Sequence, residues 1–204
     1  MTLLLDHIAI SAETLEAGAD WVEMALGVPL VGEGKHTHMG THNRLLSLGD
    51  LYLEVIATDP EAPKPAWPRW FDLDNFRGPP RLTNWICRTD DLDAALATAP
   101  DGTGIATDLQ RGDYRWRFAV PASGKLPFDD RHPALIQWQG DLHPAKALRD
   151  HGIRLTRLEI THPEAPALRA SLQGLTDPRV VIALGPYHAL RASFDTPQGP
   201  RVLT

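Results

Sequence analysis

The chain has 204 residues, of which 43% are apolar and 23% charged, a composition typical of a globular protein with one large domain or two small ones. Its formal net charge of −6 argues against a general nucleic-acid binder, which needs an excess of basic residues to displace counterions from phosphates. A small-molecule or protein partner is expected instead.

The cysteine content and the first residues indicate where the protein resides. Cys87 is the single cysteine, so neither an intramolecular disulfide nor a thiolate-rich metal site is expected. The opening MTLLLDHIAI has no basic stretch and reaches Asp6 and His7 too early for a signal peptide. Because no window reaches the roughly 18 apolar residues of a membrane span, we expect a cytoplasmic protein without membrane contact.

The first third of the chain predicts the element order β-α-β-β-β. LLLDHIAIS is typical of a strand buried on both faces. In the following segment Leu15, Ala19, Val22 and Leu26 recur at helical spacing, and Gly27 supplies a stop. Three short strand-like runs come next, LVGEGKH, HNRLLSLGD and LYLEVIA.

The same order then begins again. Six prolines between residues 57 and 80 mark a connection rather than regular structure. Beyond it, LTNWICR predicts a strand, TDDLDAALATA a short helix, and YRWRFAV and ALIQWQG two further strands. Overlaying the two halves puts Asn84 on His7 and Gln137 on Glu54, so residues 1–60 and 80–140 are interpreted as two diverged modules.

A third, shorter unit is predicted over residues 141–204. LTRLEITH, a helix around Leu168 and Leu172, and the strands VVIALG and HALRASFDT repeat the order partially as βαββ. Arg157 takes the place of His7 in this overlay. We therefore expect this unit to pack on the same sheet system without contributing a site.

Two polar residues stand in strongly apolar strands. Glu54 lies within LYLEVIA and His7 within LDHIAI, and a buried carboxylate must be protonated, paired or bound to a metal. Imidazole and carboxylate are good ligands for divalent transition metals. The alternatives are a hydrogen-bonded core histidine and a salt bridge from Glu54 to Arg44 or Arg88.

The combination of LDHIAI, a helix, GEGKHTHMGTHNRL and YLEVIA resembles the glyoxalase-like branch of the vicinal-oxygen-chelate superfamily. The resemblance covers roughly residues 3–140. It implies an α+β fold in which paired βαβββ modules form curved mixed sheets around a cavity, with the third unit as a partial module.

The resemblance also implies a site. In that superfamily each module supplies one metal ligand from its first strand and one from its last, and the matching positions here are His7, Glu54, Asn84 and Gln137. The cofactor would be Zn, Ni, Mn or Fe, with Glu54 as the catalytic residue. Residues expected to line the substrate pocket are His36, Thr41, Asn43, Arg44, Trp85 and Trp138.

Asparagine and glutamine replace two of the usual strong ligands, which leaves two main functions open, besides an interaction or structural protein that uses the scaffold with its pocket filled. One is a metal-assisted lyase, isomerase or dioxygenase acting on a small oxygenated substrate. The other is a metal-free small-ligand-binding protein of the bleomycin-resistance type. The aromatic residues Trp67, Trp70, Phe71 and Phe76 of the crossover either cover the cavity or hold the crossover on the sheet. A homodimer is left open.

Overall fold

The computed structural model describes residues 2–204, which form two β-sheets. The strands of the larger sheet are β1 (Leu4–Ser11), β2 (Val31–His36), β3 (Thr41–Ser47), β4 (Tyr52–Thr58), β5 (Arg81–Arg88), β6 (Ile105–Arg111), β7 (Tyr114–Val120) and β8 (Ala134–Gln139). Those of the smaller sheet are β9 (Arg154–His162), β10 (Val180–Leu184), β11 (Ala189–Asp195) and β12 (Arg201–Leu203).

The helices are short apart from the first. They are α1 (Leu15–Leu26), the 3-10 turn η1 (Trp70–Asp72), α2 (Leu92–Leu96), α3 (Pro127–Asp130), α4 (Pro144–Ala147) and α5 (Ala165–Ala170). Helix α1 begins at Thr14, whose hydroxyl accepts from the Ala17 amide, and ends at Gly27 with a φ of 75°. None of the helices in the described part of the chain is long and apolar enough to cross a bilayer.

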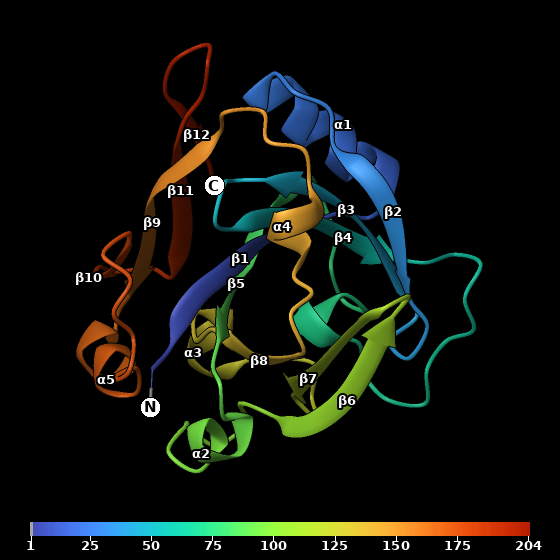
Figure 1. The fold of residues 1–204 in the computed structure, drawn as a ribbon. Helices are drawn as coiled ribbons and strands as arrows, with labels where there is room; N and C mark the ends of the chain where they lie inside the picture. The colour runs from blue at the N-terminus through green and yellow to red at the C-terminus, as the bar shows by residue number, and fades with distance from the viewer. Residues whose placement is uncertain (1) are drawn as a thin grey trace.

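The predicted paired βαβββ modules are confirmed. The order of the larger sheet is β2-β3-β4-β1-β5-β8-β7-β6, so the modules meet where β1 pairs antiparallel with β5. Within each module the first strand also pairs parallel with the last, β1 with β4 and β5 with β8. The sheet curls around its concave face, as Figure 1 shows, and this curl creates the space for a site.

The last quarter of the chain forms the smaller sheet rather than extending the larger one. Its strands are ordered β10-β9-β11-β12, and the unit stands to one side of the modules in Figure 1, coloured orange to red. Its apolar residues share one hydrophobic core with the modules, in which Phe194 and Leu158 join Leu5 and Trp85. The unit thus packs against the outer face of the larger sheet.

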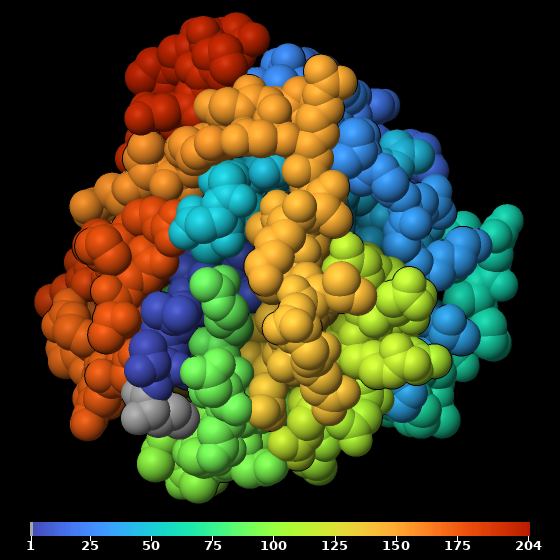
Figure 2. All heavy atoms as spheres, viewed as in Figure 1, coloured from blue at the N-terminus to red at the C-terminus, as the bar shows by residue number. Residues whose placement is uncertain are grey.

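Two connections cover the concave face. In the crossover, Trp70 and Phe71 are buried in a second hydrophobic cluster together with Phe118, whereas Trp67 stays 42% exposed. The segment containing α4 runs across the front of the molecule, between the early strands and the β6–β7 hairpin (Figure 2). The concave face is therefore enclosed from two sides.

Candidate active site

A small cavity lies on the concave face, between the two modules. Its volume is about 30 Å³, room for one or two water-sized groups. The lining combines polar groups of the first module with aromatic groups of the crossover and the second module: His7, His36, Asn43, Tyr52, Glu54, Trp70, Phe71, Arg111, Trp116, Phe118, Ile136 and Trp138. A ligand larger than this must displace side chains to enter.

Asp6 and His7 act together at one wall, although they are neighbours on a strand. Successive side chains of a regular strand point to opposite faces. Here the pairing of β1 with β5 shifts between Leu5 and His7, so that Asp6 is the extra residue of a bulge, a device that re-aims side chains. As a result the Asp6 carboxylate accepts from His7 Nδ1 at 2.7 Å.

Asp6 is a fully buried anion with three side-chain donors. Besides His7, its Oδ2 atom accepts from His143 Nε2 at 2.9 Å and from Trp138 Nε1 at 3.1 Å. Burial by itself would raise the pKa of Asp6, but the hydrogen bonds from His143 and His7 outweigh it and hold the pKa well below its usual value. Asp6 therefore stays ionised and fixes the orientation of His7.

The other nitrogen of His7 faces Glu54. His7 Nε2 lies 3.7 Å from Glu54 Oε2. Burial would lower the pKa of His7, but the two carboxylates outweigh it and raise the pKa. Burial would likewise raise the pKa of Glu54, and the His7 imidazolium instead lowers it to about 2. The shifts at all three residues thus favour a buried chain of alternating charges along this wall, Asp6⁻, His7⁺ and Glu54⁻.

Asn43 links Glu54 to the opposite side of the cavity. Its Nδ2 atom donates to Glu54 Oε1 at 2.5 Å, and its Oδ1 atom accepts from Arg111 Nη1 at 2.8 Å. His36 Nε2 lies 3.4 Å from the Asn43 amide nitrogen, and its Nδ1 lies 3.1 Å from the Thr41 hydroxyl. Burial lowers the pKa of His36 to about 4, so this imidazole is neutral at physiological pH.

The remaining wall is aromatic. The rings of Trp70, Trp116, Phe118 and Trp138 contact one another at centroid distances of 5.1 to 6.2 Å, with His36 among them. The indole N–H of Trp70 is buried and has no hydrogen-bond partner among residues 2–204. An unpaired buried donor is costly, and this one belongs to a cavity-lining side chain.

Several predicted residues meet at this cavity and others lie elsewhere. His7, Glu54, His36, Asn43 and Trp138 all line it. Thr41 lies behind His36 and holds its ring. Two others are absent from the lining: Arg44, which follows Asn43 on β3 and so points to the other face, and Trp85, which is buried in the core on the outer face and donates to the carbonyl of Arg131.

Gln137 lies away from the cavity. Its side-chain amide caps the start of α2, accepting from the Leu92 amide at 3.2 Å and donating to the Asp90 carbonyl at 2.7 Å. The strand register explains the difference from the overlay. On β8, Ala134 lies opposite Ile86, as Glu54 lies opposite Ala9 in the first module.

Because the overlay of Asn84 on His7 also puts Ile86 on Ala9, Ala134 occupies the place of Glu54. The sequence overlay, which had put Gln137 on Glu54, is therefore displaced by three residues from the register in the structure. The overlay could not fix this register, because ALIQWQG contains no feature that marks it. The second module thus has no carboxylate at this position.

The residues present do not fit the expected four-ligand metal centre. Asn84 is 1% exposed and outside the cavity lining, and neither polar atom of its amide has a partner among residues 2–204. The Arg111 guanidinium lines the cavity and would repel a divalent cation. Within the described chain no three His, Cys, Asp or Glu side chains are grouped to hold a metal ion. His7 and Glu54 remain as an ion pair.

Some residues of the site were not identified from the sequence. These are Asp6, Tyr52, Phe118, Arg111, Trp116, Ile136 and His143. Asp6 had a signal, a second polar residue in an apolar strand beside His7. Tyr52, whose ring stacks on His7 at a centroid distance of 4.3 Å, lies two residues before Glu54 on the same strand, β4. Arg111 and His143 had no such signal, because only the curl of the sheet and the path of the segment containing α4 bring them to the site.

Comparisons with known proteins agree with this fold. The family model described as a glyoxalase-like domain matches residues 5–176. A search of curated proteins found no match. Among solved structures, a hypothetical protein from Staphylococcus aureus is similar with a TM-score of 0.62 and 14% identity, over 92% of this chain and 88% of that one.

Two methylmalonyl-CoA epimerases are more distantly similar in structure. The one from Mycobacterium tuberculosis has a TM-score of 0.43 and 18% identity, over 68% of this chain and 88% of its own. The one from Streptomyces coelicolor has a TM-score of 0.47 and 17% identity, over 70% of this chain and 99% of its own. Because the family model covers most of the sequence, the chain belongs to the glyoxalase-like domain family of the vicinal-oxygen-chelate superfamily.

Proposed function

We propose that the protein catalyses proton transfer at a carbon next to a carbonyl group of a small anionic substrate, a reaction of the isomerase or lyase type. The observation that carries the proposal is the buried chain Asp6–His7–Glu54 at the wall of an aromatic cavity. Titratable groups with strongly shifted pKa values in a closed pocket are typical of active sites.

The cavity has groups for each part of such a substrate. Arg111 can pair with a carboxylate, because its guanidinium lines the cavity and has no carboxylate within 4 Å in residues 2–204. The unpaired indole N–H of Trp70 can donate to the carbonyl oxygen. In 2-oxo acids a carboxylate is bonded to a ketone carbon, so a carboxylate oxygen and the ketone oxygen lie side by side.

The proposed step moves one proton. The Glu54 carboxylate takes a proton from the carbon next to the carbonyl, and the C–H electron pair forms the C=C bond of an enolate. The negative charge that develops on the carbonyl oxygen is stabilised by the donors Trp70 and His7. Return of a proton to the same carbon, or to a different atom, completes an exchange or an isomerisation.

The resting charges explain how Glu54 can act as a base. With a pKa of about 2, Glu54 is ionised but weakly basic while His7⁺ is its nearest charge. An anionic head in the cavity would share the positive charge of His7 and Arg111 and so favour proton uptake by Glu54. Asp6 is the positioning residue, since it holds His7 through Nδ1 and leaves Nε2 facing the cavity.

Deuterium exchange tests the proposal. In D2O the wild-type protein should replace the C3 protons of 2-oxobutanoate by deuterium, followed as loss of their NMR signal against a protein-free sample. Glu54→Gln should slow the catalysed exchange by about 100-fold or more. Glu61→Gln is the matched control, because this carboxylate is 80% exposed and pairs with Lys35 away from the cavity.

Equal exchange in the wild type and in Glu54→Gln would contradict the role of Glu54. If 2-oxo acids bind but neither protein catalyses exchange, the alternative of a small-ligand-binding protein is supported instead. Binding is read from the fluorescence of the cavity tryptophans Trp70, Trp116 and Trp138.

A further inference from the structure

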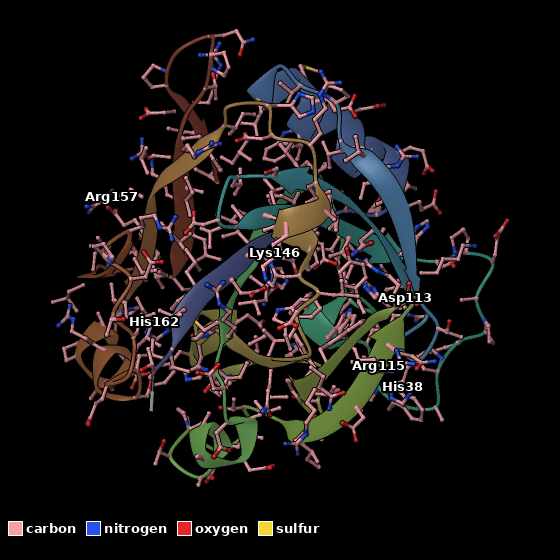
Figure 3. The ribbon with its side chains drawn as sticks, viewed as in Figure 1. His38, Asp113, Arg115, Lys146, Arg157 and His162 are labelled. Atoms are coloured by element: carbon pink, nitrogen blue, oxygen red, sulfur yellow. The ribbon has the colours of Figure 1, made fainter. Side chains whose placement is uncertain are left out.

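A second, larger space adjoins the cavity. It is an open groove of about 520 Å³ between β2 and the β6–β7 hairpin, and it shares the side chains of Asn43 and Arg111 with the cavity. The tip of the hairpin, marked by Asp113 in Figure 3, lies beside the end of β2. Asn43 and Arg111 therefore form the boundary between the inner cavity and the outer groove.

The boundary is held closed by one hydrogen bond. Arg111 Nη1 donates to Asn43 Oδ1 at 2.8 Å. A guanidinium has five N–H groups, and this is the single side-chain or backbone acceptor that Arg111 contacts among residues 2–204. Such a lightly bound cation can leave Asn43 for a stronger acceptor, and an incoming carboxylate is one.

Gly34 gives Arg111 the space to lie across this boundary. A Cβ atom at Gly34 would collide with Arg111 Nη1 and would lie 2.8 Å from Arg111 Cδ and 2.6 Å from Asn43 Oδ1. The backbone of Gly34 has no positive φ, so the requirement for glycine comes from this close approach rather than from strain. The absent side chain on β2 is part of the closure.

The outer groove has room for an uncharged chain. Apolar side chains of Leu45, Tyr114, Leu142 and Leu148 line it, and its acidic side chains, Glu33 and Asp113, disfavour a second anionic group there. Its lysine, Lys35, is already paired with Asp59 and Glu61, so it is not free to bind a second anionic group. The inner cavity, at about 30 Å³, is too small for such a chain.

We propose that Arg111 is a gate and anion anchor, and that the substrate is a 2-oxo-type carboxylate whose head enters the inner cavity while an apolar chain lies in the outer groove. The carboxylate draws Arg111 away from Asn43, which opens the passage between the two spaces. The inference rests on the proposed function for the chemistry at the head, and adds the substrate class and the specificity residue.

The first test is a series of increasing chain length. Pyruvate, 2-oxobutanoate, 2-oxohexanoate and 2-oxooctanoate are titrated against tryptophan fluorescence. Each added methylene buried in the groove should tighten binding by about two- to fourfold. Equal affinity for pyruvate and 2-oxooctanoate would overturn the assignment of the groove.

The second test is the anchor. Arg111→Met should weaken binding of 2-oxooctanoate by about 10- to 100-fold, while binding of the uncharged ketone 2-octanone changes little. Arg111→Lys keeps the positive charge but lacks the planar guanidinium. Its affinity for 2-oxooctanoate should lie between those of the wild type and Arg111→Met. Wild-type affinity for 2-oxooctanoate in a folded Arg111→Met protein would overturn the anchor.

Gly34→Ala tests the gate without replacing a residue that lines the inner cavity. Its Cβ should push Arg111 off Asn43, weaken binding of 2-oxooctanoate, and leave binding of 2-octanone equal or tighter. Added to Arg111→Met, the same change should have a smaller effect than in the wild type, since its contact with the guanidinium is then lost and the contact with Asn43 Oδ1 remains. Full additivity of the two changes would contradict the gate.

Failure of the inference and failure of the proposed function are distinguishable. Binding is read by fluorescence, also in Glu54→Gln, and exchange by NMR. If binding depends on chain length and on Arg111 but no deuterium exchange occurs, the proposed reaction is contradicted and the proposed ligand class is supported. If exchange depends on Glu54 but not on Arg111, only the proposed role of Arg111 as gate and anchor is contradicted.

Discussion

Asp6 owes its position beside His7 to the bulge in β1, and its charge is stabilised by three side-chain donors and by the Arg88 guanidinium at 3.5 Å. Asp6→Asn should destabilise the fold by about 3 kcal/mol, because it removes the charged partner of a buried ion pair. Denaturant unfolding measures this loss. The same variant should lower the protonated fraction of His7 at pH 7, followed by nitrogen NMR of the imidazole.

Asp50→Asn is a suitable control for Asp6→Asn. Asp50 is 62% exposed and pairs with Arg179, so its replacement should cost no more than about 1 kcal/mol. Equal losses for the two variants would contradict the special position of Asp6.

The buried imidazole of His36 should make the free energy of unfolding fall as the pH is lowered. Burial lowers its pKa to about 4 in the folded state, against about 6.5 when unfolded. The unfolded chain therefore binds the proton first, so the contribution is fully present above pH 6.5 and is lost as the pH falls toward 4. Its size is up to about 3 kcal/mol.

Unfolding free energies measured from pH 7 to 4 test the His36 prediction. Replacing His36 by Gln should remove this part of the slope, although His132, whose pKa burial also lowers to about 4, keeps its own part. An unchanged slope in His36→Gln would show that this imidazole titrates normally.

The residues at the metal-ligand positions of the second module predict that the proposed activity does not need a metal ion. Asn84 and Ala134 stand where the first module has His7 and Glu54, and neither is a strong ligand. Treatment with EDTA should leave deuterium exchange unchanged, and elemental analysis should find no stoichiometric metal. Zn, Ni, Mn or Fe that is present in the wild type and lost in Glu54→Gln would contradict this.

The residues that sequence reasoning located are those with a local signal. His7 and Glu54 are polar positions in apolar strands, and His36 and Asn43 belong to the loop that carries the family resemblance. Arg111 could not be found in this way, because its role depends on the curl of the sheet and on the absence of a side chain at Gly34. No local pattern encodes either.

At the scale of elements, α1 lies close against β4 because Gly18 has no side chain. A Cβ at Gly18 would lie 2.5 Å from Val55 Cγ1 and 2.8 Å from the Ala12 Cβ. Gly18→Ala should therefore cost about 1 to 3 kcal/mol through overpacking, which exceeds the gain in helix propensity of about 0.5 to 1 kcal/mol. Denaturant unfolding measures the balance.

Val55→Ala provides the matched background for Gly18→Ala, since it removes the contacting methyl group. There, adding the alanine at position 18 should cost less stability than in the wild type, because the contact with Ala12 Cβ remains. A net gain in stability from Gly18→Ala alone would show that the helix shifts freely on the sheet.

Elements with strong periodicity were predictable, as α1 and β1 show. Strand β6 was not, because IATDLQR is mostly polar and half-exposed at the edge of the sheet, so its alternation carries little signal. The shift in β8 has a similar origin. A seven-residue overlay fixed its presence, but pairing with β5 fixes its register.

At the scale of the whole molecule, one hydrophobic core joins the small sheet to the modules. Phe194 of β11 is 1% exposed within the core that also contains Leu5 of β1. The chain should unfold in one transition. Phe194→Ala should lower the free energy of unfolding of the whole chain by about 3 to 5 kcal/mol. In this variant the amides of β1 should lose as much protection from hydrogen exchange as those of β11.

Loss of protection confined to β9–β12 would show instead that the small sheet opens independently. The sequence predicted this unit, but the expectation that residues 141–204 contribute no site residue does not hold for His143, which donates to Asp6. Its separate sheet was not foreseen, because the order of elements does not specify which strands pair.

The most direct test of the account is a crystal structure of Glu54→Gln with 2-oxooctanoate. We expect C3 of the ligand within about 3.5 Å of the residue 54 side chain, the carboxylate on Arg111, and the alkyl chain in the outer groove. A ligand bound elsewhere, or an Arg111–Asn43 hydrogen bond that persists beside it, would contradict the account.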